Sequence, residues 1–124
     1  MLPLSLRERK HMIVLETPRL FLRHLTFDDL GAVRTLYSDP VVMVTKGGVR
    51  SPELIEQQVK GYIEEYTTVG YCFWAVVLRQ SDRFIGLCGL LDQQAVDGQA
   101  EIEVAYTLAK EYWNQGLATE AAQA

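Results

Sequence analysis

Hydrophobic and polar residues alternate near the end of the chain, along residues 101–108. One set of alternate positions carries Ile102, Val104, Tyr106 and Leu108, and the other carries Glu101, Glu103, Ala105 and Thr107. This period of two predicts a β-strand whose first set faces the core. Residues 109–115 have no period and predict a loop. Strong helix formers follow from about Gly116, so a helix is expected to begin there.

The chain opens with two predicted extended segments, Ile13–Glu16 and residues 20–25, separated by Thr17-Pro18. A proline favours an extended residue before it. A first helix is predicted from Thr26, because Thr26 and Asp29 have the spacing of a capping box. Its predicted apolar face carries Leu30, Val33, Leu36 and Tyr37.

A second helix is predicted from Ser51-Pro52-Glu53, which combines a capping residue, a proline at the first position and an acid in the first turn. Its predicted apolar stripe carries Ile55, Val59, Tyr62 and Tyr66. Residues 41–50, between the two helices, are expected to form an irregular connection. Lys46-Gly47-Gly48 within it lacks the glycine spacing of a Walker loop, which favours a flexible surface loop.

A β-hairpin is predicted from residues 71–79 and 84–91, around a turn at residues 80–83. Both faces of both strands are apolar, which is typical of a sheet covered on both sides. Pairing Arg79 with Phe84 would place Ala75 opposite Cys88 and Trp74 opposite Gly89, so that Gly89 makes room for the indole. The two cysteines, Cys72 and Cys88, would not face each other, which argues against a disulfide.

Composition narrows the possible functions. The chain has 124 residues, 48% of them hydrophobic, and a net charge of −4, which fits a single domain without a basic patch for nucleic acid. Its apolar runs are too short for a membrane span. Two cysteines without a CxxC motif and two isolated histidines predict no metal site, and free thiols favour a reducing, cytoplasmic location. Residues 1–11 are expected to be a flexible leader, with Met12 a candidate natural start.

The junction between the last strand and the last helix has the features of an anion site. The first turn of a helix carries unpaired N–H groups and the positive end of the helix dipole, and small residues let a phosphate approach. Residues 105–124, AYTLAKEYWNQGLATEAAQA, resemble the acetyl-CoA-binding motif of the GNAT N-acetyltransferases, in the branch that includes the ribosomal-protein N-terminal alanine acetyltransferases. The motif reads roughly Q/R-x-x-G-x-G/A, and Trp113, Gly116 and Ala118 occupy its places. The opening LETPRLFLR, residues 15–23, resembles the first strands of the same branch.

The resemblance implies a mixed α+β fold, namely the N-terminal part of a GNAT domain: an antiparallel meander with two helices and the start of the cofactor-loop helix. A domain of this family normally continues with further helices and strands. The expected organisation is therefore an incomplete N-acetyltransferase domain at residues 12–124. Its last strand would be an exposed edge that could pair with another chain as a homodimer.

The resemblance also implies site residues. The cofactor loop would bind acetyl-CoA through the backbone of Gln115, Gly116, Leu117, Ala118 and Thr119. The strand before it would bind the pantetheine arm through Val104, Ala105 and Tyr106. Glu103 and Glu101 are the candidate bases for deprotonating the amine, with solvated carboxylates on an open face as the alternative. The general acid, often a tyrosine in the family, would lie beyond this chain, because Tyr106 is expected on the apolar face.

The implied function is transfer of an acetyl group from acetyl-CoA to a primary amine of a protein N-terminus or small molecule, impaired in an incomplete domain. The alternative is a non-catalytic GNAT-like fragment acting in ligand binding or dimerisation. Binding of acetyl-CoA in preference to ATP or NAD would distinguish the acetyltransferase from a general phosphate-binding domain, and turnover would distinguish it from the non-catalytic fragment.

Overall fold

The computed structural model describes residues 13–94 and 100–123. The expected leader, Met12 and the turn signal Asp97-Gly98 lie outside these residues. Five strands form one antiparallel sheet in chain order: β1 (Ile13–Glu16), β2 (Leu20–Arg23), β3 (Phe73–Leu78), β4 (Arg83–Gln94) and β5 (Ala100–Leu108). The helices are η1 (Phe27–Asp29), α2 (Leu30–Tyr37), α3 (Pro40–Met43), α4 (Pro52–Thr68), η2 (Lys110–Tyr112) and α5 (Leu117–Gln123). The mixed fold with an antiparallel meander is therefore confirmed.

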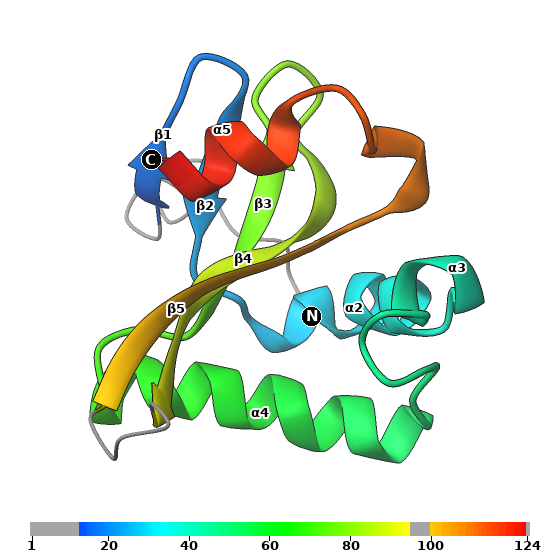
Figure 1. Cartoon of the computed structure of the whole chain (residues 1–124), viewed down its shortest axis with the longest axis vertical. Helices are drawn as coiled ribbons and strands as arrows, with labels where there is room; N and C mark the ends of the chain where they lie inside the picture. Colours follow the sequence, from blue (N-terminus) through cyan, green and yellow to red (C-terminus); the bar gives the residue numbers. More distant parts are fainter. Residues whose placement is uncertain (1–12, 95–99, 124) are drawn as a thin grey trace.

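The sheet is covered on both faces, as the apolar hairpin predicts. Figure 1 shows α4 and α2 on one side and α5 crossing the other. The first face packs Ala75, Val77 and Leu87 against Val33, Leu36, Ile55 and Val59 of α2 and α4. The second packs Leu20, Leu22, Val76 and Leu108 against Leu117 and Ala121 of α5.

The predicted helix starts are confirmed. The Thr26 N–H donates to Asp29 Oδ2 at 2.9 Å, although this cap opens the short η1 before α2. The Ser51 hydroxyl accepts from the Leu54 N–H at 3.2 Å at the start of α4. Gly70, with φ +95°, donates its N–H to Glu65 O and ends α4. At both helix starts a polar side chain satisfies a backbone N–H: Asp29 accepts from the capping residue Thr26, and Ser51 accepts from Leu54 in the first turn.

The connection at residues 41–50 is not irregular throughout, and the prediction is wrong at its beginning. Pro40–Met43 forms the short helix α3, because Asp39 accepts from the N–H groups of Val41 and Val42 and the proline fixes the first helical position. Val42 and Met43 are buried. The stop signal of α2 is therefore also the start signal of α3.

The predicted register of the β3–β4 hairpin is also wrong. The strands pair Leu78 with Arg83, and an irregularity between Val76 and Val77 then shifts the pairing, so that Trp74 lies opposite Cys88 and Phe73 opposite Gly89. A Cβ at Gly89 would lie 2.6 Å from the Phe73 Cα, so Gly89 makes room for the backbone of β3 and not for an indole. Cys72 and Cys88 are buried and free, as expected.

Candidate functional site

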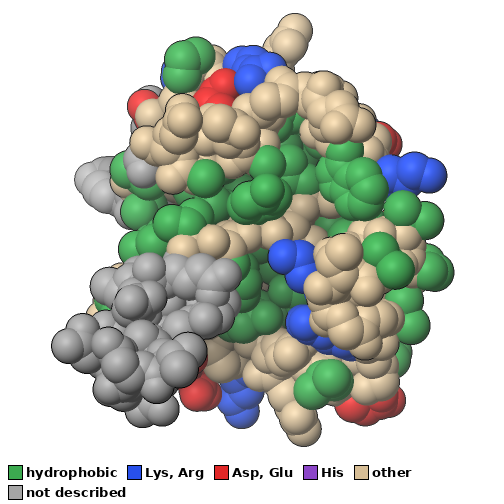
Figure 2. Space-filling model, viewed as in Figure 1, with side chains coloured by type: hydrophobic (Ala, Val, Ile, Leu, Met, Phe, Trp, Pro, Cys, Tyr) green, Lys and Arg blue, Asp and Glu red, His purple; other side chains and the backbone are tan. Residues whose placement is uncertain are grey.

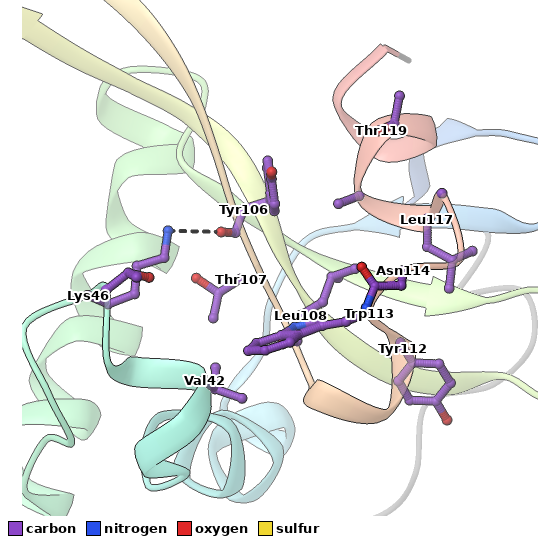
Figure 3. A pocket seen from close by; sticks show the side chains of 13 residues that line it. Val42, Lys46, Tyr106, Thr107, Leu108, Tyr112, Trp113, Asn114, Leu117 and Thr119 are labelled. Carbon is purple, nitrogen blue, oxygen red and sulfur yellow. Dashed lines mark hydrogen bonds between the residues drawn. The ribbon is translucent and has the colours of Figure 1, made fainter.

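A cleft of about 470 Å³ lies where α3, β5 and the loop before α5 meet. Segments far apart in the sequence form its walls (Figure 3). One wall carries Val42, Thr45 and Lys46, a second carries Tyr106, Thr107 and Leu108, and the third carries Tyr112, Trp113, Asn114, Gly116, Leu117, Ala118 and Thr119. Seen in space-filling form, this face of the molecule gathers hydrophobic side chains across its middle, with Lys and Arg side chains beside them (Figure 2).

The loop that lines the third wall has a fixed backbone. Trp113 donates its indole N–H to the carbonyl of Leu108 at 2.8 Å, which ties the loop to the end of β5. Asn114 and Gly116 have φ values of +60° and +76°. Asparagine and glycine are the residues that adopt this left-handed conformation most readily. The sequence Trp113-Asn114-Gln115-Gly116 thus turns the chain sharply from β5 into α5.

The wall formed by β5 corrects the predicted burial of this strand. Val104 and Tyr106 are 45% and 47% exposed, although the alternation predicts that they face the core. Leu108, on the same face, is buried because Leu117 and Ala121 of α5 pack against this end of the strand. Thr107, expected on the open face, is 8% exposed. The predicted pattern of buried and exposed positions along β5 is therefore wrong: of the face expected in the core, Leu108 is buried under α5, while Val104 and Tyr106 are exposed.

Lys46 is a residue of this site that the sequence placed in a surface loop. Its ammonium donates to the Tyr106 carbonyl at 3.1 Å and lies 6.0 Å from the centre of the Tyr106 ring. Gly47 and Gly48, with φ near +90°, follow directly. The Lys46-Gly47-Gly48 signal was visible in the sequence, but nothing local connects it with a strand 60 residues later.

The cleft favours an anionic ligand. Lys46 supplies a positive charge, and among the residues that the structure describes no aspartate or glutamate lines the walls. Glu120 is close in sequence but accepts hydrogen bonds from Thr17 and Arg19, away from the cleft lining. The first-turn N–H groups of α5 have no partner within the helix, which adds donors to this region.

The predicted cofactor residues are only partly brought together. Tyr106, Gly116, Leu117, Ala118 and Thr119 line the cleft. Val104 and Ala105 lie on β5 outside the lining. Gln115 also lies outside it, since its carbonyl accepts from Arg19 and its amide donates to the Glu111 carbonyl. Val42, Thr45, Asn114 and Thr107 also line the cleft, although none of them was named individually as a site residue.

The candidate bases are placed only by their backbone. Glu101 pairs with Gln93 and Glu103 with Leu91 in the β4–β5 ladder. Their side chains lie outside the described part of the chain, so their role stays a prediction. Over residues 13–94 and 100–123, no cluster of histidine, cysteine and acidic side chains is suited to a metal, and none of the helices described is both long and apolar enough to cross a membrane.

Comparison with known proteins identifies the family. A family model described as an acetyltransferase (GNAT) domain matches residues 19–124. This chain belongs to the GNAT acetyltransferase family. The match includes β2, where the opening motif ends, and the whole loop that lines the cleft of this GNAT domain.

Relatives of this GNAT domain agree with the assignment. An uncharacterized N-acetyltransferase, p20, of Bacillus licheniformis is 31% identical over 118 residues, which are 90% of this chain and 63% of the relative. The crystal structure of a GNAT-family acetyltransferase from Bacillus anthracis is 27% identical with a TM-score of 0.71, over 91% of this chain and 63% of that one. RimL, a ribosomal L7/L12 α-N-protein acetyltransferase solved with coenzyme A, shares the fold at 19% identity and a TM-score of 0.69, over 90% of this chain and 63% of RimL. The chain thus spans between about half and two thirds of the length of the relatives that it matches.

Proposed function

We propose that this GNAT domain binds acetyl-CoA in the cleft and serves the transfer of its acetyl group to a primary amine. The observation that carries the proposal is the cleft itself: the motif loop, β5 and the cationic Lys46 converge on one cavity in a chain of the GNAT family. Acetyl-CoA, when bound, supplies an activated acetyl group as a thioester. The proposal extends from the family, whose members bind acetyl-CoA, to the residues of this chain.

The loop is the proposed holder of the cofactor phosphates. Leu117, Ala118 and Thr119 form the first turn of α5, where backbone N–H groups are free to donate to an anion. Gly116 has no side chain and Ala118 only a methyl group, so a phosphate can approach the backbone closely. The Lys46 ammonium adds a positive charge on the opposite wall. Side chains matter little to backbone donors, so variation at Gln115 is expected to be tolerated.

The strand β5 is the proposed support for the pantetheine arm and the acceptor. Val104, Ala105 and Tyr106 lie on the end strand of the sheet, where the Tyr106 carbonyl already accepts from Lys46. An amine must lose a proton before it attacks a carbonyl, because an ammonium has no lone pair. Glu103, and after it Glu101, are the proposed proton acceptors, directly or through a water molecule. Carboxylates do this work when a cleft raises their pKa towards neutrality.

The proposal also extends to the acetyl acceptor and to the cellular location of the protein. A protein N-terminus is one acceptor class to test, since RimL modifies a ribosomal protein, and small primary amines are the other. The cytoplasm is the proposed location, because Cys72 and Cys88 are free and a reducing compartment keeps thiols so.

Isothermal titration of acetyl-CoA into the chain, beside ATP and NAD, tests the cofactor. Preference for acetyl-CoA supports the proposal, and equal affinity for all three or no binding contradicts it. A turnover assay with a peptide N-terminus and a panel of small amines then separates an enzyme from a non-catalytic GNAT-like relative. Acetyl-CoA binding without turnover would favour the relative.

Dimerisation is the second candidate function, favoured by the position of β5 at the end of the strand order. Exposed strand edges carry unpaired N–H and C=O groups that can pair with a second chain. Sedimentation over a range of concentrations measures this directly. A single monomer mass at all concentrations would contradict a homodimer through β5.

A further inference from the structure

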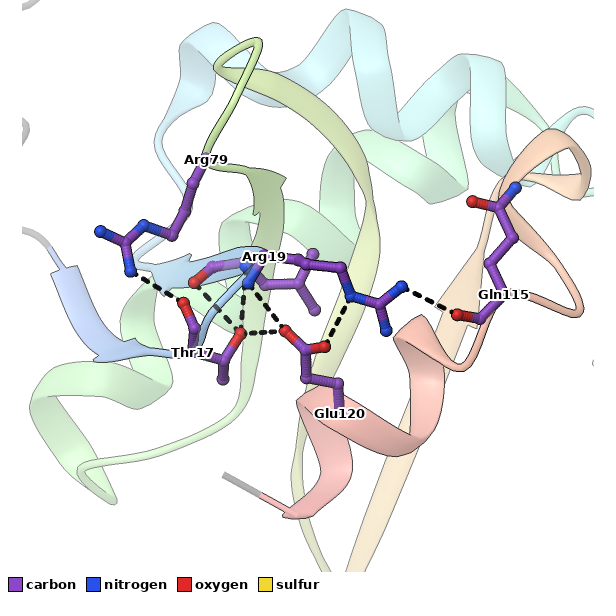
Figure 4. Close-up of polar contacts among 6 residues, drawn as sticks. Thr17, Arg19, Arg79, Gln115 and Glu120 are labelled. Carbon is purple, nitrogen blue, oxygen red and sulfur yellow. Dashed lines mark hydrogen bonds and ion pairs between the residues drawn. The ribbon is translucent and has the colours of Figure 1, made fainter.

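The opening motif at residues 15–23 has no part in the proposed cofactor site, yet the structure places it against that site. The turn between β1 and β2 carries Thr17 and Arg19, and α5 carries Glu120 about 100 residues later. Figure 4 shows these side chains converging on the start of α5. The two segments that resemble the family are therefore one physical unit.

The contacts in this unit use both oxygens of one carboxylate. The Thr17 hydroxyl donates to Glu120 Oε2 at 2.5 Å, and the Arg19 N–H donates to the same oxygen at 3.0 Å. Arg19 Nε donates to Glu120 Oε1 at 2.8 Å. Charge-assisted hydrogen bonds of this kind are stronger than neutral ones. They lower the pKa of Glu120, chiefly through the Thr17 hydroxyl and then through Arg19.

The same guanidinium also holds the loop. Arg19 Nη1 donates to the carbonyl of Gln115 at 3.0 Å. Gln115 lies between Asn114 and Gly116, which both have positive φ. A backbone in this sparsely populated region persists only where neighbouring groups hold it. Arg19 thus holds the middle of the turn that forms the cleft wall through its Nη1, and it holds α5 through the bond of its Nε to Glu120.

The contacts of Thr17 and Arg19 with Glu120, which we call the clasp, also determine where this negative charge lies at the start of α5. A carboxylate in a first helical turn is attracted to the same N–H groups as a phosphate. Thr17 and Arg19 hold the Glu120 carboxylate on the side of β1 and β2. Because Glu120 is engaged there, it does not line the cleft.

We propose that Arg19 is a positioning residue for the cofactor loop: it bridges Glu120 of α5 and the Gln115 carbonyl, and thereby holds residues 113–119 in the conformation that binds acetyl-CoA. The inference rests on the proposed function for its ligand. It assigns Arg19 no contact with acetyl-CoA.

The test compares Arg19→Ala and Arg19→Lys with Arg79→Ala. Arg79 is the matched control, because Arg79 Nη1 donates to the Thr17 carbonyl at 2.9 Å on the same turn. A lysine keeps the charge but lacks the planar fork that serves two acceptors. Three quantities are measured for each variant: amide hydrogen exchange at residues 113–119 without ligand, the unfolding midpoint, and the dissociation constant for acetyl-CoA.

We expect Arg19→Ala to speed exchange in residues 113–119 and to weaken acetyl-CoA binding by about tenfold, the effect of losing a charge-assisted hydrogen bond. Arg19→Lys should fall between Arg19→Ala and the unchanged chain. Arg79→Ala should leave exchange in the loop and the affinity unchanged.

Unchanged loop exchange in Arg19→Ala would overturn the positioning role, whether or not acetyl-CoA binds. Faster exchange with an unchanged dissociation constant would also overturn it, because the loop would then not need Arg19 to bind. Equal loss of affinity in Arg79→Ala would assign the effect to the turn as a whole and contradict Arg19 as its agent. If the unchanged chain fails to bind acetyl-CoA, the proposed function is wrong, and the exchange data alone decide whether Arg19 positions the loop.

Discussion

At the scale of single residues, the cleft depends most on backbone conformations that only certain residues adopt. Gly116 has φ +76°, and a Cβ there would lie 3.5 Å from Arg19 Nη2. There is therefore room for a larger side chain at Gly116, and only the positive φ disfavours one. Gln115 next to it has its backbone carbonyl engaged and its side chain exposed. The two neighbours should respond very differently to substitution.

We expect Gly116→Val to lower the free energy of unfolding by about 1–3 kcal/mol and to weaken acetyl-CoA binding, because a β-branched residue resists positive φ. Gln115→Ala should change both quantities little. Urea denaturation and isothermal titration measure them. Gly70→Val is the control, since Gly70 has φ +95° at the end of α4, away from the cleft. The Gly70→Val variant should lose stability and keep its affinity for acetyl-CoA. If it also loses affinity, general destabilisation by backbone strain would explain the effect of Gly116→Val.

The two cysteines give a second prediction at this scale. Burial raises the pKa of the Cys72 thiol to about 12 and that of the Cys88 thiol to about 11. The thiolate is the reactive form, so both groups should resist Ellman's reagent at pH 8 in the native chain. Added denaturant should release two thiols. Rapid modification of either cysteine without denaturant would show that the segment around it opens locally.

At the scale of elements, the sequence predicts which segments form better than it predicts how they pair. Capping residues and apolar periods predict α2 and α4 because these signals act within one turn of the chain. The register of β3 against β4 already differs from the prediction at the turn, where Leu78 pairs with Arg83. An irregularity between Val76 and Val77 then shifts the later pairs by one residue, and neither feature has a local sequence signal. The predicted burial of the apolar face of β5 failed for a related reason, since α5 packs on Leu108 but leaves Val104 and Tyr106 exposed.

Close strand packing makes Gly89 a sensitive position within β4. We expect Gly89→Ala to lower the free energy of unfolding by about 3 kcal/mol, because its Cβ would lie 2.6 Å from the Phe73 Cα and backbone atoms cannot yield as a flexible side chain does. Gly61→Ala, the same substitution within α4, has no atom within 4 Å of its Cβ. It should raise the free energy of unfolding by about 0.5–1 kcal/mol. Urea denaturation of both variants measures the contrast, and equal effects would contradict the close packing of β3 on β4.

The candidate site was predictable only in its contiguous part. Gly116, Leu117, Ala118 and Thr119 belong to one motif, which the sequence displays without any knowledge of the fold. Lys46 lies 60 residues before Tyr106 in the sequence, and only the folded chain shows that it lines the same cleft and donates to the Tyr106 carbonyl. The same holds for Arg19, whose motif was visible but whose partners lie near residue 120.

At the scale of the whole molecule, the contact of the β1–β2 turn with α5 joins the two ends of the described chain. Helix α5 has seven residues, and isolated helices of this length are unstable in water. Its stability must therefore come from packing of Leu117 and Ala121 on the sheet and from the contacts of Glu120. The clasp thus contributes to global stability as well as to the shape of the cleft.

This contribution should depend on pH in a defined direction. The pKa of Glu120 is lowered in the folded chain by the Thr17 hydroxyl and Arg19. A carboxylate with a lowered pKa stabilises the folded state fully above its ordinary value near 4.5, and the stabilisation disappears as the pH falls through the folded-state pKa. A guanidinium stays charged throughout this range, so the change belongs to the carboxylate.

The measurement compares the unchanged chain with Glu120→Gln, which keeps the shape of the side chain and removes its charge. We expect the unchanged chain to be more stable from about pH 5.5 to 7, because it retains the charge-assisted bonds from Arg19, and the difference to shrink as the pH falls below 4.5. Glu64→Gln on the exposed face of α4 controls for the loss of one negative charge. Equal stability of Glu120→Gln and the unchanged chain at pH 7 would mean that the clasp adds nothing to folding, and Arg19 would then act on the loop through the Gln115 carbonyl alone.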